Sequence, residues 1–210
     1  MKKIDIRKLV LLAMFTAIIV IMAFTPLGYL RVGAISITFL MIPVVVGAIT
    51  LGPAFGAILG GVFGITSLIQ CFGMDWFGTT LMGINPAFTV ILCLLPRILM
   101  GWLSGLIYLA IKKIEKKGFW ACCAASLSGA LLNTIGFTGL LVLFFVSSFF
   151  GTSQAFFDSM IAGGVISEAS LMAVVGVLIT LNALIEAGVC LVVGTAIAFA
   201  VKNALDKKGK

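Results

Sequence analysis

The sequence predicts an all-α membrane protein, a single bundle of six transmembrane helices with both termini in the cytoplasm. Of the 210 residues, 62% are hydrophobic and 10% are charged, whereas a soluble domain carries about 25% charged residues. Apolar segments of nearly the length that a bilayer requires recur along the chain. The basic residues gather at the ends of these segments, as in cytoplasmic loops. We therefore expect residues 1–210 to form one transmembrane domain.

A helix that crosses the bilayer needs about 20 apolar residues. The segments that approach this length are Leu9–Phe24, the shorter Phe39–Leu51, Pro53–Gln70, Pro86–Ile111, Phe119–Ser148, and a last one that starts between Leu171 and Thr180 and ends at Ala200. The stretches 25–38, 71–85 and 149–170 contain glycine and polar residues and are expected to be outer loops.

The distribution of charge determines the expected orientation. Twelve of the 14 Lys and Arg residues form three clusters, which are Lys2, Lys3, Arg7 and Lys8; Lys112, Lys113, Lys116 and Lys117; and Lys202, Lys207, Lys208 and Lys210. Six crossings place all three clusters on one side of the membrane, and an odd number would divide them. Asp75, Asp158 and Glu168 then lie on the outer side.

Several classes of protein are excluded by what the sequence lacks. It has no histidine, and its five cysteines do not have the spacing of metal ligands. The phosphate-binding motif of ATPases and the common hydrolase motifs are missing as well. Glu186 and Asp75 do not form a recognisable catalytic pair. We expect no catalytic residue, no metal and no cofactor, and the chain is not predicted to be an enzyme.

Polar residues inside the spanning segments indicate a binding site. A charged or amide side chain is costly within the bilayer and therefore usually serves a function. Helical rise places four such residues at similar depth, from the midplane to the outer half. They are Arg97, Asn133, Asn182 and Glu186. Arg31 lies in the first outer loop. An alternative interpretation is that Arg97 and Glu186 only pair to hold helices together.

Two further features concern the backbone and the packing of helices. Pro96 precedes Arg97 and is expected to leave a backbone carbonyl without its helical partner. Small residues four positions apart lie on one face of a helix and allow backbones to approach closely. This spacing occurs at Gly56, Gly60 and Gly64, at Gly101 and Gly105, and at Ala13 and Ala17.

Together these stretches resemble the substrate-binding S component of energy-coupling factor (ECF) transporters, the bacterial vitamin importers. The opening KLVLLAMFTAIIVIMAFTPLGYL (residues 8–30) is similar to the family's first helix, and IPVVVGAITLGPAFGAILGGVFGITSLI (residues 42–69) to its second and third. LPRILMGWLSGLIY (residues 95–108) is similar to the fourth helix. The pair Asn182 and Glu186 is similar to the N-x-x-x-E pattern of several members.

The resemblance implies a mechanism and partners. A vitamin would bind at the outer face of the bundle, beneath the outer loops, in the bacterial plasma membrane. The chain would then associate with a transmembrane coupling subunit and two ATPase subunits, and Ala13 and Ala17 would contact the coupling subunit. No nucleic acid is expected as a partner.

The identity of the vitamin is the least defined expectation. The first helix and the IPVVVGAITLGP block are most similar to pantothenate-type members, and an arginine in the pocket suits a carboxylate ligand. Riboflavin or another vitamin is an alternative. A different class of function is a stand-alone secondary transporter in which Glu186 is a proton site.

Overall fold

The computed structural model describes residues 6–25, 28–32, 35–115, 118–152 and 180–207. Its elements are α1 (Ile6–Ala23), β1 (Tyr29–Val32), β2 (Ile35–Thr38), α2 (Met41–Leu51), α3 (Pro53–Gln70), α4 (Trp76–Ile84), α5 (Pro86–Lys112), α6 (Phe119–Thr152), the π-helical turn η1 (Cys190–Gly194) and α9 (Thr195–Lys207). Among the described residues, five helices are long and apolar enough to cross a membrane. They are α1, α3, α5, α6 up to Leu141, and the continuous stretch Thr180–Leu205.

The outer stretches contain more regular structure than the sequence predicts. Residues 25–38 include an antiparallel hairpin of β1 and β2, so the expectation of an all-α protein is wrong at this point. Helix α4 lies within 71–85, and residues 149–152 belong to α6. The rest of the predicted loop 149–170, and the start of the last span before Thr180, lie outside the described residues. Backbone polar groups near a bilayer must be paired, which favours hairpins and helices over open loops.

Helix α2 is short and lies inside the bundle. Its 11 residues rise about 16 Å, which is too little to cross a bilayer alone. Every residue from Met41 to Leu51 except Thr50 is buried. Gly52 has a φ of 108°, a left-handed conformation that glycine adopts without strain, and it separates α2 from α3.

Helices α3 and α5 meet along a row of glycines. A Cβ atom added to Gly56 would meet the carbonyl oxygen of Gly101, and one added to Gly60 would meet that of Arg97. At Gly64 the added atom would lie 2.8 Å from the carbonyl oxygen of Cys93. The spacing of four residues therefore brings two backbones into contact, as in other membrane helix pairs. The partner of this glycine face is α5.

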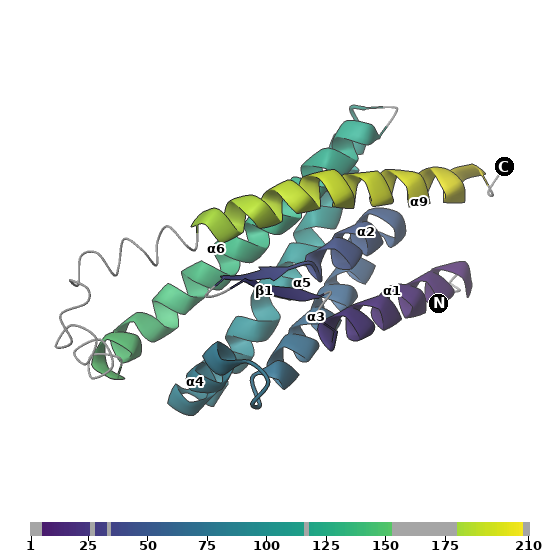
Figure 1. Cartoon of the computed structure of the whole chain (residues 1–210). Coiled ribbons are helices and arrows are strands. Elements are labelled where there is room, and N and C mark those ends of the chain that lie inside the picture. The colour runs from purple at the N-terminus through teal and green to yellow at the C-terminus, as the bar shows by residue number, and fades with distance from the viewer. Residues whose placement is uncertain (1–5, 26–27, 33–34, 116–117, 153–179, 208–210) are drawn as a thin grey trace.

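The contacts also establish how the ends of the bundle are arranged. The Gln70 amide donates to the Ala23 carbonyl at 2.7 Å, so α1 and α3 end together. At the opposite end, the ammonium groups of Lys112 and Lys202 lie 5.8 and 4.5 Å from the centre of the Tyr108 ring. Figure 1 shows both chain ends on this side of the bundle and α4 on the other. Among the described residues, Arg7, Lys112 and Lys202, one from each basic cluster, thus lie at the same end.

The cysteines are components of the packing. All five are free thiols, and Cys71, Cys93, Cys122 and Cys190 are buried. Two of them are neighbours, because the sulfur atoms of Cys71 and Cys93 lie 3.7 Å apart between the end of α3 and α5. Among the described residues, no group of three or more His, Cys, Asp or Glu side chains is arranged to hold a metal ion.

The glycine contact gives a direct test of the fold. Gly60→Ala is expected to lower the free energy of unfolding by about 1–3 kcal/mol, because the new methyl group overlaps the backbone of α5. Gly61→Ala is the matched control, because its Cβ would lie 3.8 Å from the nearest atom, on Ile98. The control is expected to be neutral or stabilising, by up to about 1 kcal/mol. Thermal unfolding in detergent measures both, and equal melting temperatures would contradict the packing of α3 on α5.

Candidate functional site

Arg97 compensates for a defect in its own helix. Pro96 has no N–H, so the carbonyl of Leu92, four residues earlier, lacks its helical partner. The Arg97 guanidinium turns back along α5 and its Nη1 donates to this Leu92 oxygen at 2.6 Å. The carbonyl that the sequence predicts to be free is thus paired, and the side chain is held in one direction by its own backbone.

Two aromatic rings flank the same guanidinium. The Arg97 Cζ atom lies 5.5 Å from the centre of the Phe63 ring, on α3, and 4.7 Å from that of Phe137, on α6. Both distances are within the range of cation–π attraction. The arginine is 8% exposed, and its Nε–H has no hydrogen-bond partner in the part of the chain that the structure describes. A buried cation with a donor to spare is a site for an anionic group.

Asn133 is one helical turn from Phe137 and lies on the same face of α6. Gly129 and Gly136 share this face, and their Cβ positions are near Val45 of α2 and Pro96 of α5. Asn133 is 7% exposed, and its Oδ1 atom has no partner within the chain. The amide therefore contributes a second unpaired polar atom on the side of α6 that faces Arg97.

Glu186 and Asn182 join the last span to the hairpin. The Glu186 Oε1 atom accepts a hydrogen bond from the Thr38 backbone N–H at 2.8 Å and one from the Asn182 amide at 3.4 Å. The Asn182 Oδ1 atom is buried without a partner. The charges of Arg97 and Glu186 are close enough to influence each other. The hydrogen bonds of Glu186 nevertheless go to the hairpin and the amide, so the structure gives the carboxylate a role besides pairing with Arg97.

Tyr29 connects these two groups of residues. It pairs with Thr38 across the hairpin, and its phenol is close enough to Arg97 for the two to interact electrostatically. The phenol oxygen is buried and lies close to the Ser67 hydroxyl of α3. Burial raises the pKa of Tyr29 to about 12, against the opposing effect of the Arg97 charge. The tyrosine is therefore a neutral donor beside the arginine.

The structure places Asn182 beside Glu186 and Arg97 within electrostatic range of Glu186, and it puts Asn133 one turn from Phe137, which contacts Arg97. It also adds other residues. Arg31 pairs with Ser36 across the hairpin, but its side chain and those of Trp76 and Phe77 lie outside the described part. The residues that sequence reasoning missed are Tyr29, Thr38, Phe63 and Phe137. A signal for the first two exists, because the β-branched, alternating runs YLRV and ISIT flank a glycine. The two phenylalanines have no such signal in a chain with 17 of them.

The arrangement is suited to binding rather than to covalent chemistry. The Nε of Arg97 and the amide oxygens of Asn133 and Asn182 are buried polar atoms without hydrogen-bond partners among the described residues. Such atoms are costly unless a bound molecule or water pairs with them. With the Tyr29 phenol they offer one cation, one neutral donor and two amide acceptors. A small anionic molecule with hydroxyl or amide groups would match them.

The ionisation of Tyr29 is a measurable property of this site. Tyr29 and Tyr108 are the two tyrosines of the chain, so Tyr108→Phe leaves one phenol to titrate. We expect its absorbance to change near pH 12, because burial disfavours the phenolate. A midpoint near the ordinary value of about 10 would contradict the burial of Tyr29. The double variant with Tyr29→Phe and Tyr108→Phe has no phenol and should lose the change, which makes it the control.

Comparison with known proteins identifies the family of the chain. Residues 7–198 match the family model described as ECF transporter, substrate-specific component. The chain is 34% identical to the pantothenate transporter PanT of Leuconostoc mesenteroides over 146 residues, which cover 66% of this chain and 70% of the relative. It is 29% identical to the pantothenic acid transporter PanT of Lactococcus lactis over 200 residues, or 89% and 96% of the two chains. The chain therefore belongs to the family of ECF transporter substrate-specific components, as a multi-pass protein of the bacterial cell membrane and not an enzyme.

Proposed function

We propose that the chain binds a vitamin, with pantothenate favoured, from outside the cell and delivers it through a shared ATP-driven coupling module. The observation that carries this proposal is the set of buried polar atoms without partners around Arg97. The ligand would lie between Arg97, Asn133, Asn182 and Glu186, close to the hairpin that contains Arg31. We propose that residues 1–210 act as one transmembrane domain in this process.

The chemistry of pantothenate supports this choice of ligand. Pantothenate has a carboxylate, two hydroxyl groups and an amide. A carboxylate would accept from the free Nε–H of Arg97, and hydroxyl groups would donate to the amide oxygens of Asn133 and Asn182. Both relatives carry the name of a pantothenate transporter, which supports the same ligand for this chain.

A sixth crossing of the membrane is part of the proposal. Helices α1 and α3 both end beside the Gln70–Ala23 hydrogen bond, so the chain must return across the bilayer between them. The hairpin and α2 lie in this stretch, and together they would supply the length that α2 alone lacks. Six crossings place the basic end of the bundle, with both termini, in the cytoplasm. The site would then open toward the outer side.

The proposed partners are a transmembrane coupling subunit and two ATPase subunits. Ala13 and Ala17 are exposed on α1, one turn apart, in a helix that is mostly unburied within the chain. Two small residues at this spacing would allow a helix of another subunit to approach closely. This accessibility supports docking of the coupling subunit on α1.

Removal of the arginine tests the binding site. Arg97→Gln is expected to weaken pantothenate binding about 10- to 100-fold, the equivalent of the roughly 1.5–3 kcal/mol of a hydrogen bond to a charged group. Isothermal titration of the purified chain without any ATPase measures the affinity. Lys113→Gln is the matched control, because it removes one exposed positive charge at the other end of the bundle.

Arg97→Gln also breaks the bond to Leu92 and can affect folding, so Asn182→Ala provides an independent variant. Asn182→Ala removes an Oδ1 atom that has no partner among the described residues, together with one long hydrogen bond of 3.4 Å to Glu186, so it is expected to weaken binding several-fold with only a small change in melting temperature. Wild-type affinity in both variants would contradict the site. If the chain binds riboflavin in preference to pantothenate, the proposed site stands and the proposed ligand is riboflavin instead.

Docking is tested separately on α1. Ala13→Trp is expected to abolish vitamin uptake by the chain combined with its coupling module, because the indole would hold the partner helix away. Ligand binding by the isolated chain should remain. Ile18→Trp is the control, because Ile18 is 41% exposed on a different side of α1. Uptake by the chain alone, driven by a proton gradient in liposomes, would favour a secondary transporter that uses Glu186.

A further inference from the structure

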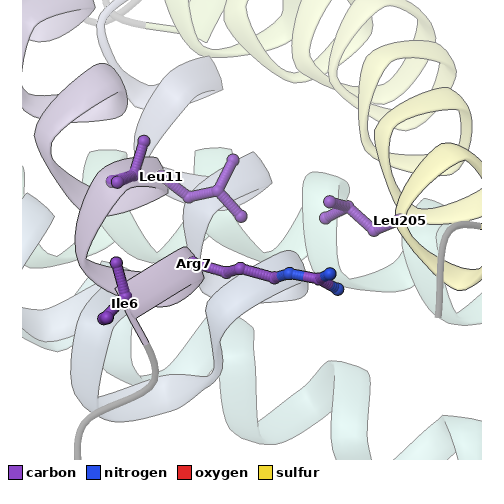
Figure 2. Close-up of a pocket in the computed structure, with 5 residues that line it drawn as sticks. Ile6, Arg7, Leu11 and Leu205 are labelled. Carbon is purple, nitrogen blue, oxygen red and sulfur yellow. The ribbon is translucent and has the colours of Figure 1, made fainter.

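A slot between α1 and α9 is separate from the candidate vitamin site. Its volume is about 420 Å³, and it is lined by Ile6, Arg7, Val10, Leu11 and Leu205. It lies where α1 begins and α9 ends, at the basic end of the bundle, and it is partly open to the surroundings. Figure 2 shows the Arg7 side chain extending from α1 into the gap, toward Leu205 on α9.

The walls of the slot have the character of a lipid contact. Four of the five lining residues are aliphatic, and Ile6 and Val10 are 78% and 53% exposed. The fifth residue is an arginine at the very end of the span, where the headgroups of the bilayer lie. An apolar channel capped by one guanidinium matches a molecule with an acyl chain and an anionic head.

Basic residues close to Arg7 and Leu205 in the sequence add to this preference. Residues 1–8 and 202–210 contain eight basic residues and two acidic ones, Asp5 and Asp206. A basic cluster at the membrane surface attracts anionic lipids, with about 1 kcal/mol per basic residue. Arg7 also interacts within the chain. A guanidinium carries five N–H donors, so it can bind a phosphate together with another acceptor.

We propose that this slot binds one anionic phospholipid, with its phosphate at Arg7 and an acyl chain along Val10, Leu11 and Leu205. A protein helix is a poorer occupant, because a helix with its side chains is about 10–12 Å across. It would have to separate α1 from α9, whose side chains line the same cavity. An acyl chain fits between them without such a movement. The proposal is independent of the identity of the vitamin.

The experiment counts lipids that stay bound to the full chain. The protein is reconstituted in nanodiscs of equal phosphatidylglycerol and phosphatidylcholine, released into mild detergent and examined by native mass spectrometry. The wild type is expected to retain one phosphatidylglycerol in preference to phosphatidylcholine. Arg7→Gln should reduce this retention about fivefold, the equivalent of one basic contact. Lys8→Gln, which removes the next charge on another side of α1, should reduce it less than Arg7→Gln does.

A second variant keeps the Arg7 charge and fills the slot between α1 and α9. Leu205→Trp fills the slot from α9, and it should also lose the lipid while Arg7 remains. Equal losses in Arg7→Gln and Lys8→Gln would overturn the proposal, because they would indicate general surface attraction. Equal retention of the two lipids, or full retention in Leu205→Trp, would overturn it as well. Displacement of the lipid by glycerol phosphate, which has the head group without the acyl chain, would also overturn the proposal. The same holds if Leu205→Trp changes the oligomeric state and nothing else.

Discussion

The contact between the backbones of α3 and α5 is the constraint on which the candidate site depends. Gly60 has no side chain, so the carbonyl of Arg97 can lie directly against α3. The same closeness brings Phe63, three residues further along α3, against the guanidinium. A larger residue in the glycine row would separate the two helices and move the arginine away from the ring. The close packing of α3 on α5 thus also determines how Arg97 and Phe63 are positioned.

The hydrogen bond that Pro96 removes from α5 influences the geometry of the candidate site. Proline leaves the Leu92 carbonyl without a partner, which is expensive inside a bilayer. Arg97 satisfies that oxygen and is thereby turned toward the rings of Phe63 and Phe137. One donor of the guanidinium is used to hold the side chain, and Nε–H is left over. The cost of burying a cation is partly offset by these contacts.

The hairpin connects parts of the chain that the long helices keep apart. Thr38 donates its backbone N–H to Glu186, and its partner Tyr29 lies near Arg97. A bound molecule that contacts both charged residues would therefore also lie beside the hairpin. The hairpin precedes α2, whose buried residues occupy the centre of the bundle. The hairpin, which lies beside the candidate site, and α2, which fills the core, are consecutive in the chain.

The sequence by itself determines that this is a helical membrane protein, because lipid tolerates few charges and the apolar runs have the length of a bilayer. It also identifies Arg97, Asn133, Asn182 and Glu186, since polar groups stand out in such spans. Only the tertiary structure decides that residues 29–38 form a hairpin against Glu186, and that Phe63, Phe137 and Tyr29 surround the arginine. Hydrophobicity alone cannot distinguish a ring that faces lipid from one that faces a cation, because both environments accept the same side chain.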